Sequence, residues 1–532
     1  MDIEELKAHA ISRRSALKWT AGTAAFLAQA AILENLAITP ARTANAAAFS
    51  DIQFDIGQFI NPAQIVNDGA GNVIVQFGPV FAMFLPAKLT RTPTKADQAT
   101  LASALNTIEA SYPASPSGML IASVSYGIPY FNRLPGGING TLVSTRMPRL
   151  SSNTSRFVLE EAVPSPTDVS PANPAIVKDR FNVRVLIENN DVLFQFRSDS
   201  MVNLAAIPLW FTGSNNLNGK GVPSPNFNGL FSWQTQRIQF TQIGMPRRMA
   251  NQYGFEFASR VNPDSPMTMG FTDQQVNASG PPQIVTFVGN SSAKITNANP
   301  GDYFDNGSIM HFSHVIEDLY QFYSLPNQDS RRPDGEPFAE RCQYMFRSNQ
   351  LGTPNGIPAA GNTDQFTNGG GPAHINNVFQ GTSDAMLGAQ DAGGTFTPAN
   401  QSQSATFTGA GRIGHIAALQ RVSRAADGTP MHIRNDGPGL DGMDVPAFQL
   451  FPGQGTVSAG APQFKLQFAI FVPTADFFQR MRAGTAALDL QAQFLDNEDD
   501  DNGLERFLTA TRRQNFLVPP RRHRAFPLAE LA

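Results

Sequence analysis

Four histidines in the second half of the sequence have the side-chain chemistry to bind a metal ion: His311, His314, His374 and His415. Neutral imidazole is a common ligand for zinc and related transition metals. His311 and His314 are three residues apart at the start of an expected strand, where positions i and i+3 face opposite sides. No acidic cluster accompanies them at a recognised metal-binding spacing. A shared metal site made of these histidines is therefore an alternative that the spacing disfavours.

A further histidine, His432, stands in the phrase Pro430-Met-His-Ile-Arg434, and Asp436, Asp441 and Asp444 follow it. A carboxylate that accepts the Nδ1–H of an imidazole orients the ring and raises the basicity of its Nε2, which favours metal binding. Any of the three acids could take this role. The residues alone leave two interpretations open, a metal-binding imidazole or a structural histidine on a loop.

Asp273 is an acid for which two interpretations are open. It lies in the phrase Gly270-Phe271-Thr272-Asp273-Gln274. A carboxylate in a water-poor pocket can have a pKa near the working range and can then accept and return a proton. The alternative is an aspartate that caps a turn or a helix after Gly270.

The first residues predict export. Ser12-Arg13-Arg14-Ser15-Ala16-Leu17-Lys18 matches the twin-arginine pattern, with Ala16 where a phenylalanine is usual. An apolar stretch of small residues follows from Trp19 to about Leu33, and Ala44-Asn45-Ala46 is typical of a cleavage site. We therefore expect a signal peptide over 1–46, the twin-arginine translocase as a partner, and a location in the periplasm, the cell envelope or outside the cell.

Interruptions in the apolar stretch argue against a permanent membrane span. Thr20, Gln29 and Glu34 break the stretch, and it is shorter than the roughly 20 residues that cross a bilayer. The net charge of −4 gives no indication of a nucleic-acid partner. Cys342 is the only cysteine, so no intramolecular disulfide can form, as expected for a protein that folds in the cytoplasm before export. We expect Cys342 to be a small core residue, because no catalytic frame surrounds it.

The composition and the C-terminal sequence indicate how the protein packs. Forty phenylalanines, against three tryptophans and eight tyrosines, predict a core built from phenylalanine. A basic tail from Thr511 to Pro527 follows the acidic run from Asp496 to Asp501. Because the tail contains Phe516 and Phe526, we expect an ordered arm whose arginines pair with the protein's own carboxylates. The alternative is a patch that binds anionic envelope polymers.

Hydrophobic periodicity in the first half predicts an order of strand, helix, strand, strand, helix, strand, which is the ferredoxin-like motif. The strands are expected over 73–85, 119–126, 181–187 and 233–243, and the helices over 95–111 and 191–204.

Parts of this pattern recur in the second half, with strands over 307–312 and 465–472 and helices over 315–323 and 475–482. The sequence therefore predicts an α+β fold of two ferredoxin-like halves with antiparallel sheets and long loops. The halves are expected at 47–280 and 281–532, with a polar Gly/Asn/Gln/Thr-rich insertion at about 350–410.

This order and several short phrases resemble the dye-decolourising (DyP-type) haem peroxidases, and the resemblance spans most of the mature chain. The phrases are Met119 to Gly127, Phe181 to Ile187, Gly270 to Asp273, Gly307 to Ile309, Pro430 to Arg434 and Lys465 to Met481.

The resemblance implies two ferredoxin-like halves, of the dimeric α+β barrel type, around haem b. It implies that His432 is the ligand of the haem iron and that Gly270 and Arg434 belong to cofactor-binding phrases. It also implies that Asp273 takes a proton from hydrogen peroxide and returns it to the leaving oxygen. The expected activity is peroxide-dependent one-electron oxidation of an unknown reductant, by a protein that could form a homo-oligomer.

Three departures from the family pattern matter for this activity. Gln274 replaces the last glycine of the distal motif, and no arginine lies between Asp444 and Lys465, where the family has its distal arginine. The loop after His432 is rich in aspartate and glycine. Replacement cations are near in sequence only (Arg412, Arg421 and Arg434), and His314 falls where some family members have arginine. The missing arginine, Gln274 and the long polar insertion favour the alternative of a non-catalytic exported envelope or binding protein that keeps the fold and has lost haem.

Overall fold

A computed structural model of the chain describes residues 20–38, 49–56, 64–67, 72–75, 78–178, 180–261, 265–269, 282–289, 294–323, 431–450, 455–485, 505 and 507–532. Several predictions fall outside these residues. They concern the twin arginines, the cleavage site, Gly270, Asp273, Cys342, His374, His415, Arg412, Arg421 and the 350–410 insertion.

The first half forms a four-stranded antiparallel sheet in which the strand order is β10-β3-β6-β4. Along the chain these strands come in the order first (β3), second (β4), third (β6) and fourth (β10), so the sheet order is 4-1-3-2. Helices α3 and α6 follow the first and third strands, which makes the ferredoxin-like arrangement. The bounds are β3 Phe81–Leu89, α3 Lys95–Ser111, β4 Leu120–Tyr126, β6 Val192–Ser198, α6 Met201–Phe211 and β10 Arg237–Phe240.

The second half repeats the same 4-1-3-2 order, as β17-β11-β16-β12. Helix α14 lies between β16 and β17 in sequence, as α6 lies between β6 and β10. The predicted duplication of an α+β, ferredoxin-like unit is therefore confirmed. The bounds are β11 Ser308–Glu317, β12 Ile433–Arg434, β13 Gly437–Asp441, β16 Gln463–Val472, α14 Ala475–Thr485 and β17 Leu508–Val518.

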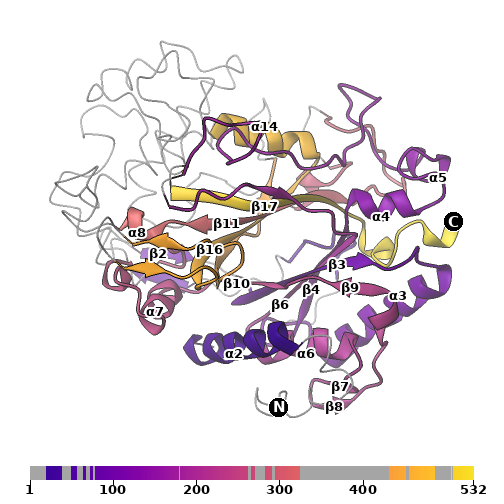
Figure 1. Ribbon diagram of the computed structural model, residues 1–532. Helices are drawn as coiled ribbons and strands as arrows, with labels where there is room; N and C mark the ends of the chain where they lie inside the picture. The colour runs from indigo at the N-terminus through magenta and orange to yellow at the C-terminus, as the bar shows by residue number, and fades with distance from the viewer. Residues whose placement is uncertain are drawn as a thin grey trace.

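The two sheets join into one curled sheet, which Figure 1 shows at the centre of the molecule. Strand β17 pairs with β11 along its length and meets β4 where Leu517 pairs with Tyr126. At the far edges, β13 lies against β10. A Cβ on Gly439 would lie 2.6 Å from the carbonyl oxygen of Ile238, so only glycine permits this approach.

Short elements complete the described chain, and none of its helices is long and apolar enough to cross a membrane. These elements are α2 Thr20–Leu36, β1 Gln64–Asn67, β2 Asn72–Val75, α4 Ile128–Arg133, α5 Thr141–Ser144, β5 Leu186–Ile187, β7 Asn216–Leu217, β8 Lys220–Gly221, η3 Phe227–Gly229, β9 Phe231–Trp233, α7 Met245–Gln252, η4 Ala258–Arg260, η5 Pro282–Val285, α8 Leu319–Phe322, β14 Phe448–Gln449, β15 Thr456–Val457, η10 Arg521–His523 and η11 Ala529–Leu531.

The predicted elements are partly correct. Helix α3 has the predicted bounds, because Thr94 and Asp97 form a capping box at its start. The prediction of a helix over 191–204 is wrong, since β6 occupies 192–198 and α6 begins only at Met201. All seven residues of β6 are buried, so the strand lacks the polar alternation that marks a half-exposed strand.

Two other predictions are also corrected. Only Leu186 and Ile187 of the predicted strand over 181–187 are in a strand, because only they pair with β17. The helix predicted over 315–323 is reduced to α8. Val315 and Ile316 instead extend β11, where they pair with both neighbouring strands.

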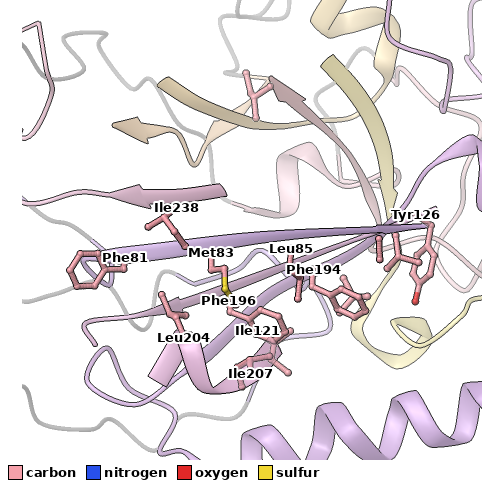
Figure 2. Close-up of a cluster of buried hydrophobic side chains, with 14 of the residues drawn as sticks. Phe81, Met83, Leu85, Ile121, Tyr126, Phe194, Phe196, Leu204, Ile207 and Ile238 are labelled. Carbon is pink, nitrogen blue, oxygen red and sulfur yellow. The ribbon is translucent and has the colours of Figure 1, made fainter. Parts of the chain in front are cut away.

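Phenylalanine builds the core, as the composition predicts. Inside the curled sheet, Phe84 stacks on Phe312 with ring centroids 4.4 Å apart, and Phe54 stacks on Phe471 at 4.6 Å. Outside it, Figure 2 shows Phe194 and Phe196 of β6 among side chains from neighbouring strands and from α6. The sheet therefore has an apolar layer on each face.

The C-terminal arm is ordered and pairs with the protein's own acids, which confirms that prediction. Arg524 and Arg521 both contact the carboxylate of Glu109, and Arg522 contacts those of Asp51 and Asp305. Phe526 is fully buried and stacks on the ring of Tyr130. These three arginines thus form ion pairs within the folded protein.

The interior stack provides a stability test. Phe312→Ala is expected to lower the free energy of unfolding by about 3–5 kcal/mol, because it removes a buried ring from a closed core and leaves a cavity. Leu531→Ala, at a residue that is 49% exposed, is the control and is expected to change that free energy by about 0.5 kcal/mol or less. Equal losses in chemical denaturation would contradict the packing described for the interior.

Candidate functional site

The predicted haem ligand, His432, lies directly before β12, and its side chain is fully buried. Strand β12 pairs with β16 through Ile433 and Arg434 and lies at the edge of the second ferredoxin-like unit. Ile433 packs against the interior apolar cluster. Because side chains alternate along a strand, Arg434 faces the opposite side of the sheet.

Two of the three acids that could orient His432 are engaged elsewhere. Asp441 Oδ2 lies 3.1 Å from Nε2 of His314. Asp444 accepts two hydrogen bonds from the guanidinium group of Arg512, at 2.6 and 2.9 Å. Asp436 is the remaining candidate. Burial raises the pKa of Asp436, although the neighbouring charge of Arg434 lowers it.

Glu317, the last residue of β11, is a buried acid that sequence reasoning did not identify as a site residue. Thr268 Oγ1 donates a hydrogen bond to Glu317 Oε2 at 2.6 Å. Burial raises the pKa of Glu317 to about 7; the Thr268 hydrogen bond opposes this shift and the charge of Asp436 adds to it. A carboxyl with such a pKa exchanges protons near neutral pH, as acid–base residues do. The only sequence signal was an acid at the end of an apolar run.

Two residues that act on the Glu317 carboxyl lie close in sequence to phrases that carry the resemblance. Thr268 stands two residues before Gly270, and Asp436 stands two residues after Arg434. Thr268 binds the carboxyl of Glu317 directly, and Asp436 acts on it electrostatically. Thr268 and Asp436, which come from distant parts of the sequence, therefore both act on one buried carboxyl.

His311 and His314 lie on opposite faces of β11, as their spacing predicts. His311 Nδ1 lies 2.6 Å from Oδ1 of Asn515, beneath α14. His314 Nδ1 lies 2.7 Å from Oγ1 of Thr511. Burial lowers the pKa of both imidazoles. No group of three or more potential metal-binding side chains occurs in the part of the chain that the structure describes, so these two histidines form no shared metal site there.

His314 belongs to a buried ionic network in which positive and negative charges balance. Arg237 contacts Glu188 at 2.5 Å, and Glu188 contacts Arg512 at 3.3 Å, which in turn binds Asp444. The members are three acids and three bases, Glu188, Asp441, Asp444, Arg237, Arg512 and Lys465. Balanced and mutually bonded charges are a structural arrangement, because each compensates the desolvation of another.

His311 belongs to a second network on the outer face of the sheet. Arg513 forms a bidentate ion pair with Asp168, at 2.6 and 2.8 Å, and donates to Ser313 Oγ at 2.7 Å. The Ser313 hydroxyl lies 2.6 Å from His311 Nε2. This serine–histidine–asparagine order is that of an activated nucleophile. Ser313 is fully buried, however, and its oxygen already accepts a hydrogen bond from Arg513. The network therefore serves to position these side chains.

A cavity of about 210 Å³ lies beside this second network. His311, Asn515 and Arg482 supply polar groups to its wall, and Phe478 of α14 stacks on the His311 ring with centroids 3.4 Å apart. The loop over 160–166 forms the remaining side. The cavity has room for a small polar molecule.

Residues 158–334 match a family of unknown function (DUF7405). No curated protein matches the sequence.

The fold is similar to that of several solved DyP-type peroxidases. A putative dyp-type peroxidase from Shewanella oneidensis is 13% identical, with a TM-score of 0.39, over 89% of this chain and 99% of the other. The DyP-type peroxidase from Cellulomonas bogoriensis is 13% identical, with a TM-score of 0.42, over 83% of this chain and 90% of the other. A dye-decolorizing peroxidase from Bacteroides thetaiotaomicron is 12% identical, with a TM-score of 0.40, over 89% and 98%. The fold assignment rests on the strand order of the chain itself.

The raised pKa of Glu317 predicts a pH effect on stability. Between pH 4.5 and about 7 the folded protein keeps a proton on this carboxyl that the unfolded chain releases, so stability falls as the pH rises. Glu317→Gln removes this pH dependence, because the amide side chain does not ionise. The free energy of unfolding of the variant, relative to the unmodified protein, is expected to increase between pH 4.5 and 8 by on the order of 3 kcal/mol. Urea unfolding across this range measures it, and parallel pH profiles would show that Glu317 titrates normally.

Proposed function

We propose that this protein binds haem b through His432 and catalyses peroxide-dependent one-electron oxidation. The observation that carries the proposal is the convergence at Glu317. Thr268, two residues before Gly270, donates a hydrogen bond to this carboxyl, and the charge of Asp436, two residues after Arg434, adds to its raised pKa. The duplicated ferredoxin-like sheet supports it, because it is the frame that the sequence resemblance implies.

On the ligand side, His432 has the side-chain chemistry that haem iron requires. A buried imidazole at a strand edge can bind iron through one ring nitrogen while the other is held by a carboxylate. Asp436 is the acid left for this role, and Arg434 lies close enough to affect its pKa. Gly270 would belong to the wall of the pocket. The haem iron, when bound, supplies peroxide binding and one-electron transfer.

On the peroxide side, carboxylates carry the proton chemistry. Asp273 is assigned the transfer of a proton from one peroxide oxygen to the other. Glu317, with a pKa of about 7, is suited to exchange protons with that site at neutral pH. Its hydrogen bond to Thr268 also fixes the chain five residues before Asp273.

The family pattern includes a distal arginine, and this sequence has none at the corresponding place. Strand β13 carries glycine, proline, leucine and aspartate and so offers no cation. Arg434 is the arginine of the ligand phrase that lies next to Asp436. Since a preorganised cation stabilises the negative charge that develops as the O–O bond breaks, we expect slower peroxide turnover than in a site with a distal arginine.

Export is part of the proposal. The twin-arginine translocase would export the protein to the periplasm, the cell envelope or the exterior of the cell. The reductant is an unidentified electron donor at that location.

The cavity beside His311 favours a second candidate function. About 210 Å³ with imidazole, amide and guanidinium groups in its wall suits a small polar solute. A non-catalytic exported binding protein on this fold would use this cavity and would carry no haem. A folded, colourless protein purified from cells supplied with haem would favour this candidate.

The visible absorption spectrum tests haem ligation. The protein produced with haem available is expected to show a Soret band that is lost in His432→Ala, because the variant lacks the imidazole that would hold the iron. His523→Ala, in the C-terminal arm, is the matched control. It removes a ring that stacks on Tyr303 and is expected to keep the band. A band that survives in His432→Ala would assign the ligand elsewhere.

Steady-state kinetics test the acid–base assignment. Asp273→Asn is expected to lower the rate of peroxide-dependent dye oxidation by about 10²–10⁴-fold with an unchanged Soret band, because the proton carrier is lost while the haem stays bound. Asp302→Asn, in a surface turn where Asp302 accepts from Asn299 N, is the control. An unchanged rate in Asp273→Asn would remove this residue from the mechanism.

A further inference from the structure

Helix α6 is apolar on every side. Its sequence, Met-Val-Asn-Leu-Ala-Ala-Ile-Pro-Leu-Trp-Phe, contains one polar residue, Asn203. A helix that is apolar all round must be covered on more than one face. Leu204 and Ile207 lie with side chains of β3, β4 and β6 in one cluster, which Figure 2 shows. The sheet covers only one face of α6, so another element must cover the outer face.

Helix α2 provides this cover. It runs beside α6 in Figure 1 and contacts both α6 and α7. Its buried residues are Phe26, Leu27, Ala30 and Leu33, which lie on one face at helical spacing. Ala28, on the opposite side of the helix, is exposed. The apolar stretch of the predicted signal peptide thus packs as a helix of the folded protein, with one face against the core.

Glu34 gives the contact between α2 and α6 its specificity. Its carboxylate accepts hydrogen bonds from the backbone N–H of Met201 at 2.6 Å and from Ser200 Oγ at 3.0 Å. The side chain of Ser200, the N-cap residue of α6, makes no capping bond of its own. An acid in the last turn of its own helix is unfavourable, whereas an acid at the N-terminus of another helix is favourable. Glu34 therefore caps and stabilises the N-terminus of α6. Burial raises the pKa of Glu34, although its hydrogen bonds oppose this shift.

Polar contacts also tie α2 to the rest of the fold. Gln29 donates to the carbonyl oxygen of Leu440 on β13, in the second half of the chain. Arg248 Nε of α7 donates to the carbonyl oxygen of Leu36 at 2.9 Å. The side chain of Gln242 both accepts from the backbone N–H of Ile38, at 2.9 Å, and donates to its carbonyl oxygen, at 2.6 Å. A segment destined for removal has no need of such contacts.

We propose that α2 is a permanent structural helix and stays with the folded protein after export. The proposal departs from the expectation that residues 1–46 are discarded after cleavage at Ala46. It is independent of haem binding, because it concerns the outer face of α6. Loss of α2 would uncover an apolar helix and leave its N-terminus without a cap.

Native and denaturing mass spectrometry of the protein from the exported fraction test this proposal. The native mass is expected to include residues 20–38, either in the uncut chain or as a peptide that stays bound after cleavage. A folded protein whose native mass begins at residue 47 would overturn the proposal.

Point variants supply a second test that does not depend on processing. Glu34→Ala is expected to lower the thermal midpoint of the full-length chain by several degrees, because α6 loses its cap. Asn35→Ala, at the exposed neighbouring position, is the matched control and is expected to leave the midpoint unchanged. Equal midpoints for the two variants would show that α2 does not support the fold.

Discussion

The structure depends on the pairing of its last strand, β17, with both halves of the sheet. β17 pairs with β11 over its whole length and with β4 at one position, so it is the seam between the two ferredoxin-like units. Its consecutive arginines point to opposite faces. Arg512 enters the interior ionic network, and Arg513 pairs with Asp168 on the outer face. The half-buried Arg512 and the buried Arg513 are thus each matched by an acid on their own side, which offsets the cost of removing their charges from water.

This balance of charge distinguishes the candidate site from the rest of the polar interior. The carboxylates of Asp168, Asp441 and Asp444 are held in ionised form by adjacent cations or by a histidine hydrogen bond, which lower the pKa of each. Glu317 instead binds a hydroxyl group and lies near another acid. Its pKa is raised because burial is not offset by a cation. A buried acid whose pKa lies near 7 is a feature of sites that transfer protons.

The sequence predicted the fold class but not all of its elements. Helical spacing identified α3, and the apolar sequence over 465–472 identified most of β16. β6 was mistaken for a helix because it is buried on both faces and carries no alternating polar signal. For the site, the phrase around His432 could be found by its resemblance. Glu317 could not, because its role depends on Thr268 and Asp436, which only the folded chain brings near it.

The most direct test of the account is a crystal structure of the protein after incubation with haemin. The expected result is a porphyrin whose iron is bound by His432, in a pocket to which Asp273 and Glu317 contribute. A structure in which side chains fill the space beside His432, or in which the porphyrin binds elsewhere, would contradict it.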